Sequence, residues 1–168
     1  TRAYDTIDSF FPQDDLEYLA AYYSKRLILA PLNDDVSRIN KICCNQYPGH
    51  YYTSKSVDEM SGEDNSADSD QAVTEEVLNT FTLPGFPLLS LKLKVGIPVI
   101  LLCNLNLKWG LCNRMRLLIR GISNHVLWCR ILTGSCVGYD VLIPKIKLIH
   151  KPDWVYSVAF SQYQFPVA

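Results

Sequence analysis

Basic side chains and one tryptophan form the group with the clearest chemical potential in this chain. Lysine and arginine bind phosphate groups without reading bases, and tryptophan can stack on a base with a contribution of about 1–3 kcal/mol. This combination of residue types predicts weak, salt-sensitive binding to a polyanionic strand. The candidate residues are Lys92, Lys94, Lys108, Trp109, Arg114 and Arg116.

The spacing of the basic residues indicates which of them share a face. Lys92 and Lys94 alternate with leucines, so both ammonium groups are expected on one face of a strand. Trp109 occupies a predicted turn between basic residues, where it is either a stacking platform or a turn residue packed on the end of the fold. The same strand parity, if the strand is unbroken, is shared by Arg114, Arg116 and Arg120.

Motifs of known catalytic centres are missing from these 168 residues. No GxxxxGK[ST] phosphate-binding loop, GxSxG or HExxH occurs in the sequence. Cys44 and His50 supply only two of the four ligands of a structural zinc site. We therefore predict no catalytic residue, no metal site and no cofactor in this chain.

The first half of the chain has the pattern of an α/β layer. Apolar spacing predicts a helix over Asp14–Ser24, and Leu27–Pro31 is typical of a short, fully buried strand. Asn33 is expected to cap the next helix, whose first turn contains Asp34 and Asp35. Asn33 is then either a cap alone or a cap at a strand's carboxyl end, where α/β sheets bind ligands.

The remaining elements are an acidic segment and a series of short strands. Tyr51–Val57 is a further possible strand, Met60–Gln71 is an exposed acidic loop, and Val73–Phe81 is a short helix. Strands at this spacing predict a small barrel or sandwich. They are Ser90–Lys94, Pro98–Asn104, Arg116–Ile122, Val126–Ile131, Tyr139–Pro144 and Lys147–His150.

Composition and charge set the limits of this interpretation. With 48% hydrophobic and 20% charged residues, the chain has a normal globular composition and no apolar run long enough to span a membrane. Residues 1–80 contain 15 acidic and 6 basic side chains, whereas residues 81–168 contain 2 and 10. This asymmetry indicates either a basic surface for a polyanion or a solvated basic face balanced by the acidic loop. Six cysteines without a CxxC pair favour a reducing compartment.

Several strings, in this order, resemble PIF-type superfamily-one DNA helicases, especially the Helitron branch. LILAPLNDDVSRIN at 27–40 resembles the first strand and helix of the second RecA-like motor domain. LKLKVGIPVILLCNLN at 91–106, followed by GLCNRMRLLI at 110–119, resembles the accessory module of these enzymes. VLIPKIKL at 141–148 resembles the strand that closes this module, and QFPVA at 164–168 resembles the approach to the next motor motif.

The resemblance implies an α+β fold with a partial RecA-like α/β layer followed by a small antiparallel SH3-like β-barrel. It divides the chain into a RecA-like segment at 1–88 with its acidic loop at 60–71, an accessory module at 89–150, and a return strand at 151–168. The intact family enzymes move 5′ to 3′ on single-stranded DNA, use ATP and magnesium, and serve DNA repair and recombination. Asn33 is the one position that could approach the nucleotide.

The sequence departs from the family pattern at several positions. Leu32 replaces a Thr, Cys103 an Arg, and Lys145 an Arg. Arg114 and Met115 stand where Gly-Thr is usual, which raises backbone strain if that turn requires a positive φ. Such departures suit a decayed transposon copy, a pseudogene fragment or a divergent member.

The motor motifs of the family are also absent, and both ends of the chain suggest a piece of something longer. We therefore expect no ATPase or unwinding activity from this chain alone, because phosphoryl transfer requires the phosphate loop and the metal-binding acid. The expected partners are single-stranded DNA, with RNA open, and the remaining helicase domains, in a nuclear setting without a membrane. The alternatives are a stand-alone nucleic-acid-binding module and an inert transposon-derived remnant.

Overall fold

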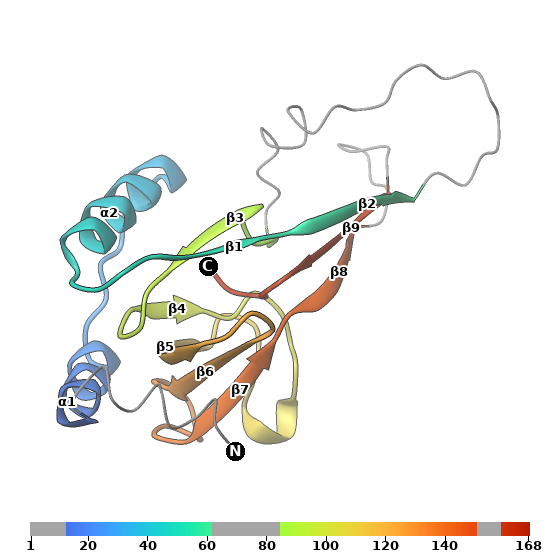
Figure 1. Ribbon diagram of the computed structural model, residues 1–168. Helices are drawn as coiled ribbons and strands as arrows, with labels where there is room; N and C mark the ends of the chain where they lie inside the picture. The colour runs from blue at the N-terminus through green and yellow to red at the C-terminus, as the bar shows by residue number, and fades with distance from the viewer. Residues whose placement is uncertain (1–12, 62–84, 151–158) are drawn as a thin grey trace, which may run out of the picture.

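The computed structural model describes residues 13–61, 85–150 and 159–168 and shows two helices beside antiparallel sheets (Figure 1). The predicted α+β class is therefore confirmed in its coarse form. The α-helices are α1 (Gln13–Ser24) and α2 (Asn33–Gln46), and a 3-10 helix, η1, spans Leu107–Trp109. The strands are β1 (Tyr52–Lys55), β2 (Val57–Ser61), β3 (Ser90–Leu93), β4 (Pro98–Ile100), β5 (Arg116–Ile122), β6 (Val126–Ile131), β7 (Asp140–Pro144), β8 (Ile146–His150) and β9 (Ala159–Gln164).

The strands form three antiparallel sheets. Their orders are β4-β5-β6-β7, β2-β9-β8 and β1-β3. β1 and β2 follow each other as one long run, with β3 beside its first part and β9 beside its second (Figure 1). The chain end joins the four-stranded sheet, because Leu101 bridges Val167 and the Ile100 N–H donates to the Ala168 carbonyl at 2.8 Å. Over the described residues, none of these sheets closes on itself.

One hydrophobic core lies inside the sheets. Alternate side chains of β5 and β6 point into it, including Leu117 and Ile119 from β5 and Leu127 and Cys129 from β6. Phe165 and Val167 reach the same cluster from the chain end and are fully buried. β6 alternates between buried and half-buried residues, whereas β5 is buried on both faces. The predicted bounds of both strands are confirmed.

Helix α1 packs on the opposite face of the four-stranded sheet. Leu16 and Ala20 lie one turn apart on its buried side, and Ala20 contacts a small second cluster with Leu118 and Leu132. The predicted helix is thus confirmed together with its buried stripe. Among the described residues, no helix is apolar and long enough to cross a membrane.

The buried strand predicted at Leu27–Pro31 is wrong. These residues form no strand, and Leu27, Ile28 and Leu29 are 59%, 68% and 84% exposed. A parallel strand buries its side chains only between neighbouring strands and covering helices, and the described residues place none beside this segment. The apolar sequence of this segment is typical of a strand, but no strand pairs with it among the described residues.

Helix α2 and the acidic segment also differ from expectation. Asn33 does not cap α2, because the helix begins at Asn33 itself and Leu32 is the residue before it, with no side-chain capping bond. The predicted acidic first turn, Asp34 and Asp35, is confirmed. Residues 60 and 61 belong to β2, whereas the rest of the predicted acidic loop and the helix at 73–81 lie outside the described residues.

Candidate nucleic-acid interface

Hydrogen bonds within the loop 104–114 fix its conformation and leave its tip exposed to solvent. The Asn106 Oδ1 accepts hydrogen bonds from the backbone N–H of Lys108 at 3.1 Å and of Trp109 at 3.4 Å. Gly110 ends η1 in the left-handed conformation at φ 69°. At the foot of the loop, the Leu105 N–H donates a hydrogen bond to the Leu111 carbonyl. A short polar side chain and a glycine thus fix the direction of the loop without burying its tip.

The tip of the loop exposes side chains suited to a nucleic acid. Trp109 is 57% exposed, Leu107 is 69% exposed, and Lys108 is exposed between them. The interpretation of Trp109 as a residue packed on the end of the fold is therefore wrong. An exposed indole beside an ammonium group is able to stack on a base while the lysine meets a phosphate.

Arg114 lies at the end of the same loop in an unfavourable backbone conformation. It is exposed, its φ is 68°, and its N–H donates to the Leu101 carbonyl at 2.7 Å. It is the one non-glycine residue with a positive φ in the described part of the chain. The left-handed conformation costs an L-residue about 1–2 kcal/mol, so the strain expected from replacing Gly here is confirmed.

The prediction that Lys92 and Lys94 share one face is wrong. Lys92 is exposed on β3, but β3 ends at Leu93 and Lys94 is 4% exposed. Its Nζ donates to the carbonyls of Cys44 at 2.8 Å and Tyr47 at 2.6 Å. Lys94 therefore satisfies the carboxyl end of α2, where a cation also complements the helix dipole.

Arg114 lies outside β5, and a register shift interrupts the strand between Ile119 and Gly121, so the shared parity predicted for an unbroken strand does not hold for all three arginines. Arg116 and Arg120 both face helix α1. Arg116 donates to the carbonyls of Tyr23 at 2.7 Å and Arg26 at 2.8 Å, at the end of α1. Arg120 is 6% exposed, bonds Asp140 at 2.7 Å, and lies 5.1 Å from the centre of the Trp128 ring. These two arginines bind helix α1 and are not exposed for contact with a nucleic acid.

A carboxylate network strengthens the contact of α1 with the sheet. Glu17 of α1 pairs with Arg130, which also bonds both carboxylate oxygens of Asp140 at 2.8 and 3.1 Å. The hydrogen bond to Asp140 raises the pKa of the Arg130 guanidinium, burial opposes this, and Glu17 adds to the rise. The charges of Arg120 and Arg130 are thus neutralised locally by Glu17 and Asp140.

Lys55 is a basic residue of the exposed surface that the sequence analysis missed. It lies on β1, where the burial pattern places Tyr52 and Ser54 inward and Thr53 and Lys55 outward. The alternation in the predicted strand Tyr51–Val57 already contained this signal. Its position follows from strand period alone, but its neighbours follow only from the pairing of β1 with β3.

The residues that could hold a metal or nucleotide are scattered over the described part of the chain. No group of three or more His, Cys, Asp or Glu side chains there is placed to hold a metal ion. All six cysteines are free, and burial raises the pKa of the Cys103 and Cys129 thiols. Asn33 is exposed at the start of α2, and its role toward a nucleotide stays a prediction.

Part of the chain matches the family model of one helicase domain. Residues 76–127 match the model of the 2B domain of the DNA helicase Pif1. The chain resembles part of a Pif1-type DNA helicase. This confirms the recognition of a PIF-type helicase fragment, while the Helitron branch stays a prediction. A search of curated protein sequences found no significant match.

Solved Pif1 structures share the fold. Pif1 from Candida albicans matches with a TM-score of 0.56 at 17% identity, over 93% of this chain and 39% of that one. Unliganded Pif1 from Bacteroides sp matches with a TM-score of 0.53 at 19% identity, over 82% and 37%. Bacteroides Pif1 bound to single-stranded DNA matches with a TM-score of 0.50 at 17% identity, over 98% and 36%. The chain thus spans well under half the length of these Pif1 helicases.

Proposed function

We propose that this chain is a piece of a Pif1-type helicase that contributes single-stranded DNA contacts through the loop 104–114. The observation that carries this proposal is the tied loop with Trp109 exposed beside Lys108. Arg114 adds a second exposed cation at the end of the loop. A related Pif1 is known bound to single-stranded DNA, which supports the choice of strand.

The proposal assigns no ATPase or helicase activity to this chain alone. A related Bacteroides Pif1 holds ADP-AlF3 together with single-stranded DNA, so the nucleotide chemistry is that of a much longer protein. The sequence here contains no phosphate-binding loop to cradle a triphosphate. In this proposal ATP and magnesium are therefore cofactors of the intact enzyme. Asn33 is the residue of this chain that we propose to approach the nucleotide there.

The remaining helicase domains are the second proposed partner. The segment Leu27–Leu32 exposes three successive apolar side chains, and Val36 and Ile42 of α2 are also exposed. Several large apolar side chains exposed on neighbouring segments of the chain support a contact with another part of a protein. We assign this apolar surface to a contact with the parallel sheet of the second RecA-like domain. The β sheets of this chain then form the SH3-like module. The whole enzyme is proposed to act in the nucleus.

Fluorescence anisotropy with a labelled single-stranded oligonucleotide tests the DNA contact. The double variant Lys108→Ala/Trp109→Ala should bind at least fivefold more weakly, because one phosphate contact and one stacking contact are lost. Lys41→Ala removes an exposed lysine on α2 and is the matched control that should bind like the unaltered chain. Binding that is absent at low salt, or that does not weaken as salt rises, would refute the proposal. A chain that does not fold on its own would instead favour the inert remnant.

A further inference from the structure

The long run formed by β1 and β2 presents an outward row of side chains. Its alternate residues Thr53, Lys55 and Val57 are exposed, and Ser54 between them is 2% exposed. Because alternate side chains of a strand point to the same side, these three positions form one continuous edge of a surface. Figure 1 shows the β1–β2 ribbon whose backbone carries these positions.

Strand β3 widens the row with a second lysine. Lys92 is directly opposite Thr53, and Ser90 is directly opposite Lys55, and both are exposed. Lys55 and Lys92 are therefore diagonal neighbours on the same face, at a typical spacing of about 7–8 Å. Two ammonium groups at this spacing are able to contact neighbouring phosphates of one strand.

Strand β9 adds an aromatic side chain to the same row. Tyr163 pairs with Val57 on one side and with Lys147 on the other, and it is 39% exposed. Directly paired residues lie on the same face of a sheet, so the tyrosine continues the row that Lys55 begins.

We propose that this face, the ribbon surface (Thr53, Lys55, Val57, Ser90, Lys92 and Tyr163), is a second contact surface for single-stranded DNA. The lysines contact phosphates and the Tyr163 ring stacks on a base, which is the combination of charge and aromatic surface that holds single strands without sequence preference. The proposal rests on the proposed function, since it names a further site for the same ligand. It also moves Lys92 away from the loop 104–114.

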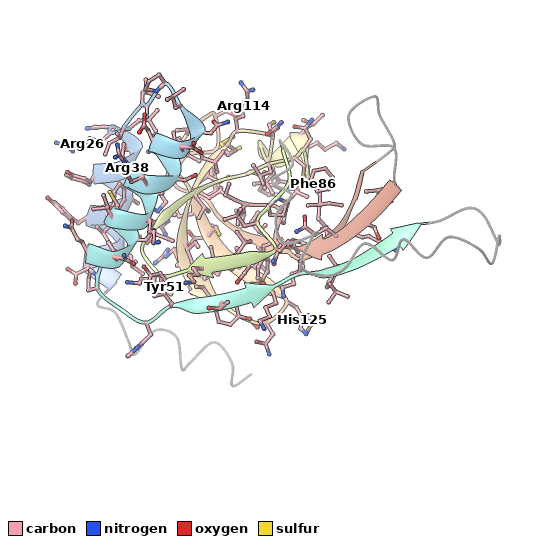
Figure 2. The ribbon with its side chains drawn as sticks, turned by 90° about the horizontal axis from the view of Figure 1, so that it is seen from above. Arg26, Arg38, Tyr51, Phe86, Arg114 and His125 are labelled. Atoms are coloured by element: carbon pink, nitrogen blue, oxygen red, sulfur yellow. The ribbon has the colours of Figure 1, made fainter. Side chains whose placement is uncertain are left out.

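The two surfaces lie on different sides of the molecule. In Figure 2, Arg114 at the end of the loop and Tyr51 beside β1 lie at opposite edges of the view. Figure 1 likewise places the β1–β2 ribbon apart from the yellow loop segment that contains η1. We therefore expect each surface to contribute separately to the binding measured.

Anisotropy titrations of the full 168-residue chain with a short single-stranded oligonucleotide test this proposal. In a background of Lys108→Ala/Trp109→Ala, residual binding should fall about tenfold when Lys55→Ala and Lys92→Ala are added, and the dependence of log K on log salt should flatten by about 0.7 for each lysine. Tyr163→Leu should weaken binding about fivefold or more, whereas Tyr163→Phe retains the ring and should bind like its parent. Lys41→Ala is the matched lysine control, and thermal melting shows that each variant is folded.

The outcomes separate this proposal from the proposed function. If loop variants weaken binding and the ribbon variants equal their parents in affinity and salt dependence, the ribbon surface is refuted and the proposed function stands. If the unaltered chain binds no oligonucleotide, the proposed function fails and the ribbon surface fails with it. If polyglutamate displaces the DNA from the loop-variant background at equal charge concentration, the surface fits an acidic protein segment, and its assignment to DNA is overturned.

Discussion

Replacing Lys94 separates a structural lysine from its exposed neighbour Lys92. Lys94 is 4% exposed and donates to two carbonyls at the end of α2, at 2.8 and 2.6 Å. Its Nζ also lies 4.1 Å from the centre of the Tyr51 ring. Lys94→Met retains most of the apolar stem but removes every one of these contacts.

The expected loss of stability follows from these contacts. A hydrogen bond from a charged donor contributes about 1.5–3 kcal/mol, and water recovers part of this at a helix end. The desolvation cost of the buried ammonium group also disappears in the variant, which lowers the net effect. We therefore expect Lys94→Met to reduce the free energy of unfolding by about 2–4 kcal/mol, a large fraction of the stability of a small domain.

Urea unfolding followed by circular dichroism measures this loss, with Lys92→Met as the matched control. Lys92 is exposed, so its replacement should leave the midpoint nearly unchanged while weakening DNA binding. Folded Lys94→Met should show the opposite result, with reduced stability and unchanged salt dependence of DNA binding. Equal stability of the two variants, or a flatter salt dependence for Lys94→Met, would refute the assignment of Lys94 to α2.

Three further predictions concern strain, charge and pH. Arg114→Gly should raise the free energy of unfolding by up to about 1 kcal/mol in urea unfolding, because relief of the positive φ outweighs the greater freedom of the unfolded chain. The same variant should weaken DNA binding. Arg114→Lys should change neither the stability nor the DNA binding. Asp140→Asn should cost about 2–4 kcal/mol in the same assay, because it removes the nearer of the two carboxylates that pair with the buried Arg120 guanidinium, at 2.7 Å against 3.8 Å for Glu17. No loss of stability would contradict the network. Burial raises the pKa of Tyr47 from 10.0 to about 12, so its contribution to stability is complete below pH 10 and is lost as pH rises toward 12. Melting temperatures across that range should fall less steeply for Tyr47→Phe than for the unaltered chain.

The strands of the β module could be predicted because their sequence carries its own burial pattern. β6 alternates buried and half-buried residues, β5 has a short apolar run that is buried on both faces, and the predicted bounds Arg116–Ile122 and Val126–Ile131 are those of the structure. The Leu16 and Ala20 spacing likewise indicated the buried side of α1. The spacing of apolar residues along an element is a local property, so it indicates the buried side whatever the element packs against.

The same reasoning failed where burial depends on a partner element. Leu27–Pro31 has the composition of a buried strand, but no described strand lies beside it, and its leucines are exposed. The sequence could not show this, because a continuous apolar run carries no information about whether its neighbours are present. Asn33 was misplaced by one position, since cap and first helical residue differ only in backbone conformation.

The sequence by itself determined the strand order along the chain, the resemblance to a Pif1-type helicase, and the group of basic residues with Trp109. Only the tertiary structure decided what those basic residues do. Lys94 and Arg116 satisfy the carboxyl ends of the two helices, whereas Lys108 and Trp109 remain in solvent. The physical reason is that a cation binds carbonyl oxygens as readily as phosphates, and which of them lies within reach is set by packing between segments far apart in the chain.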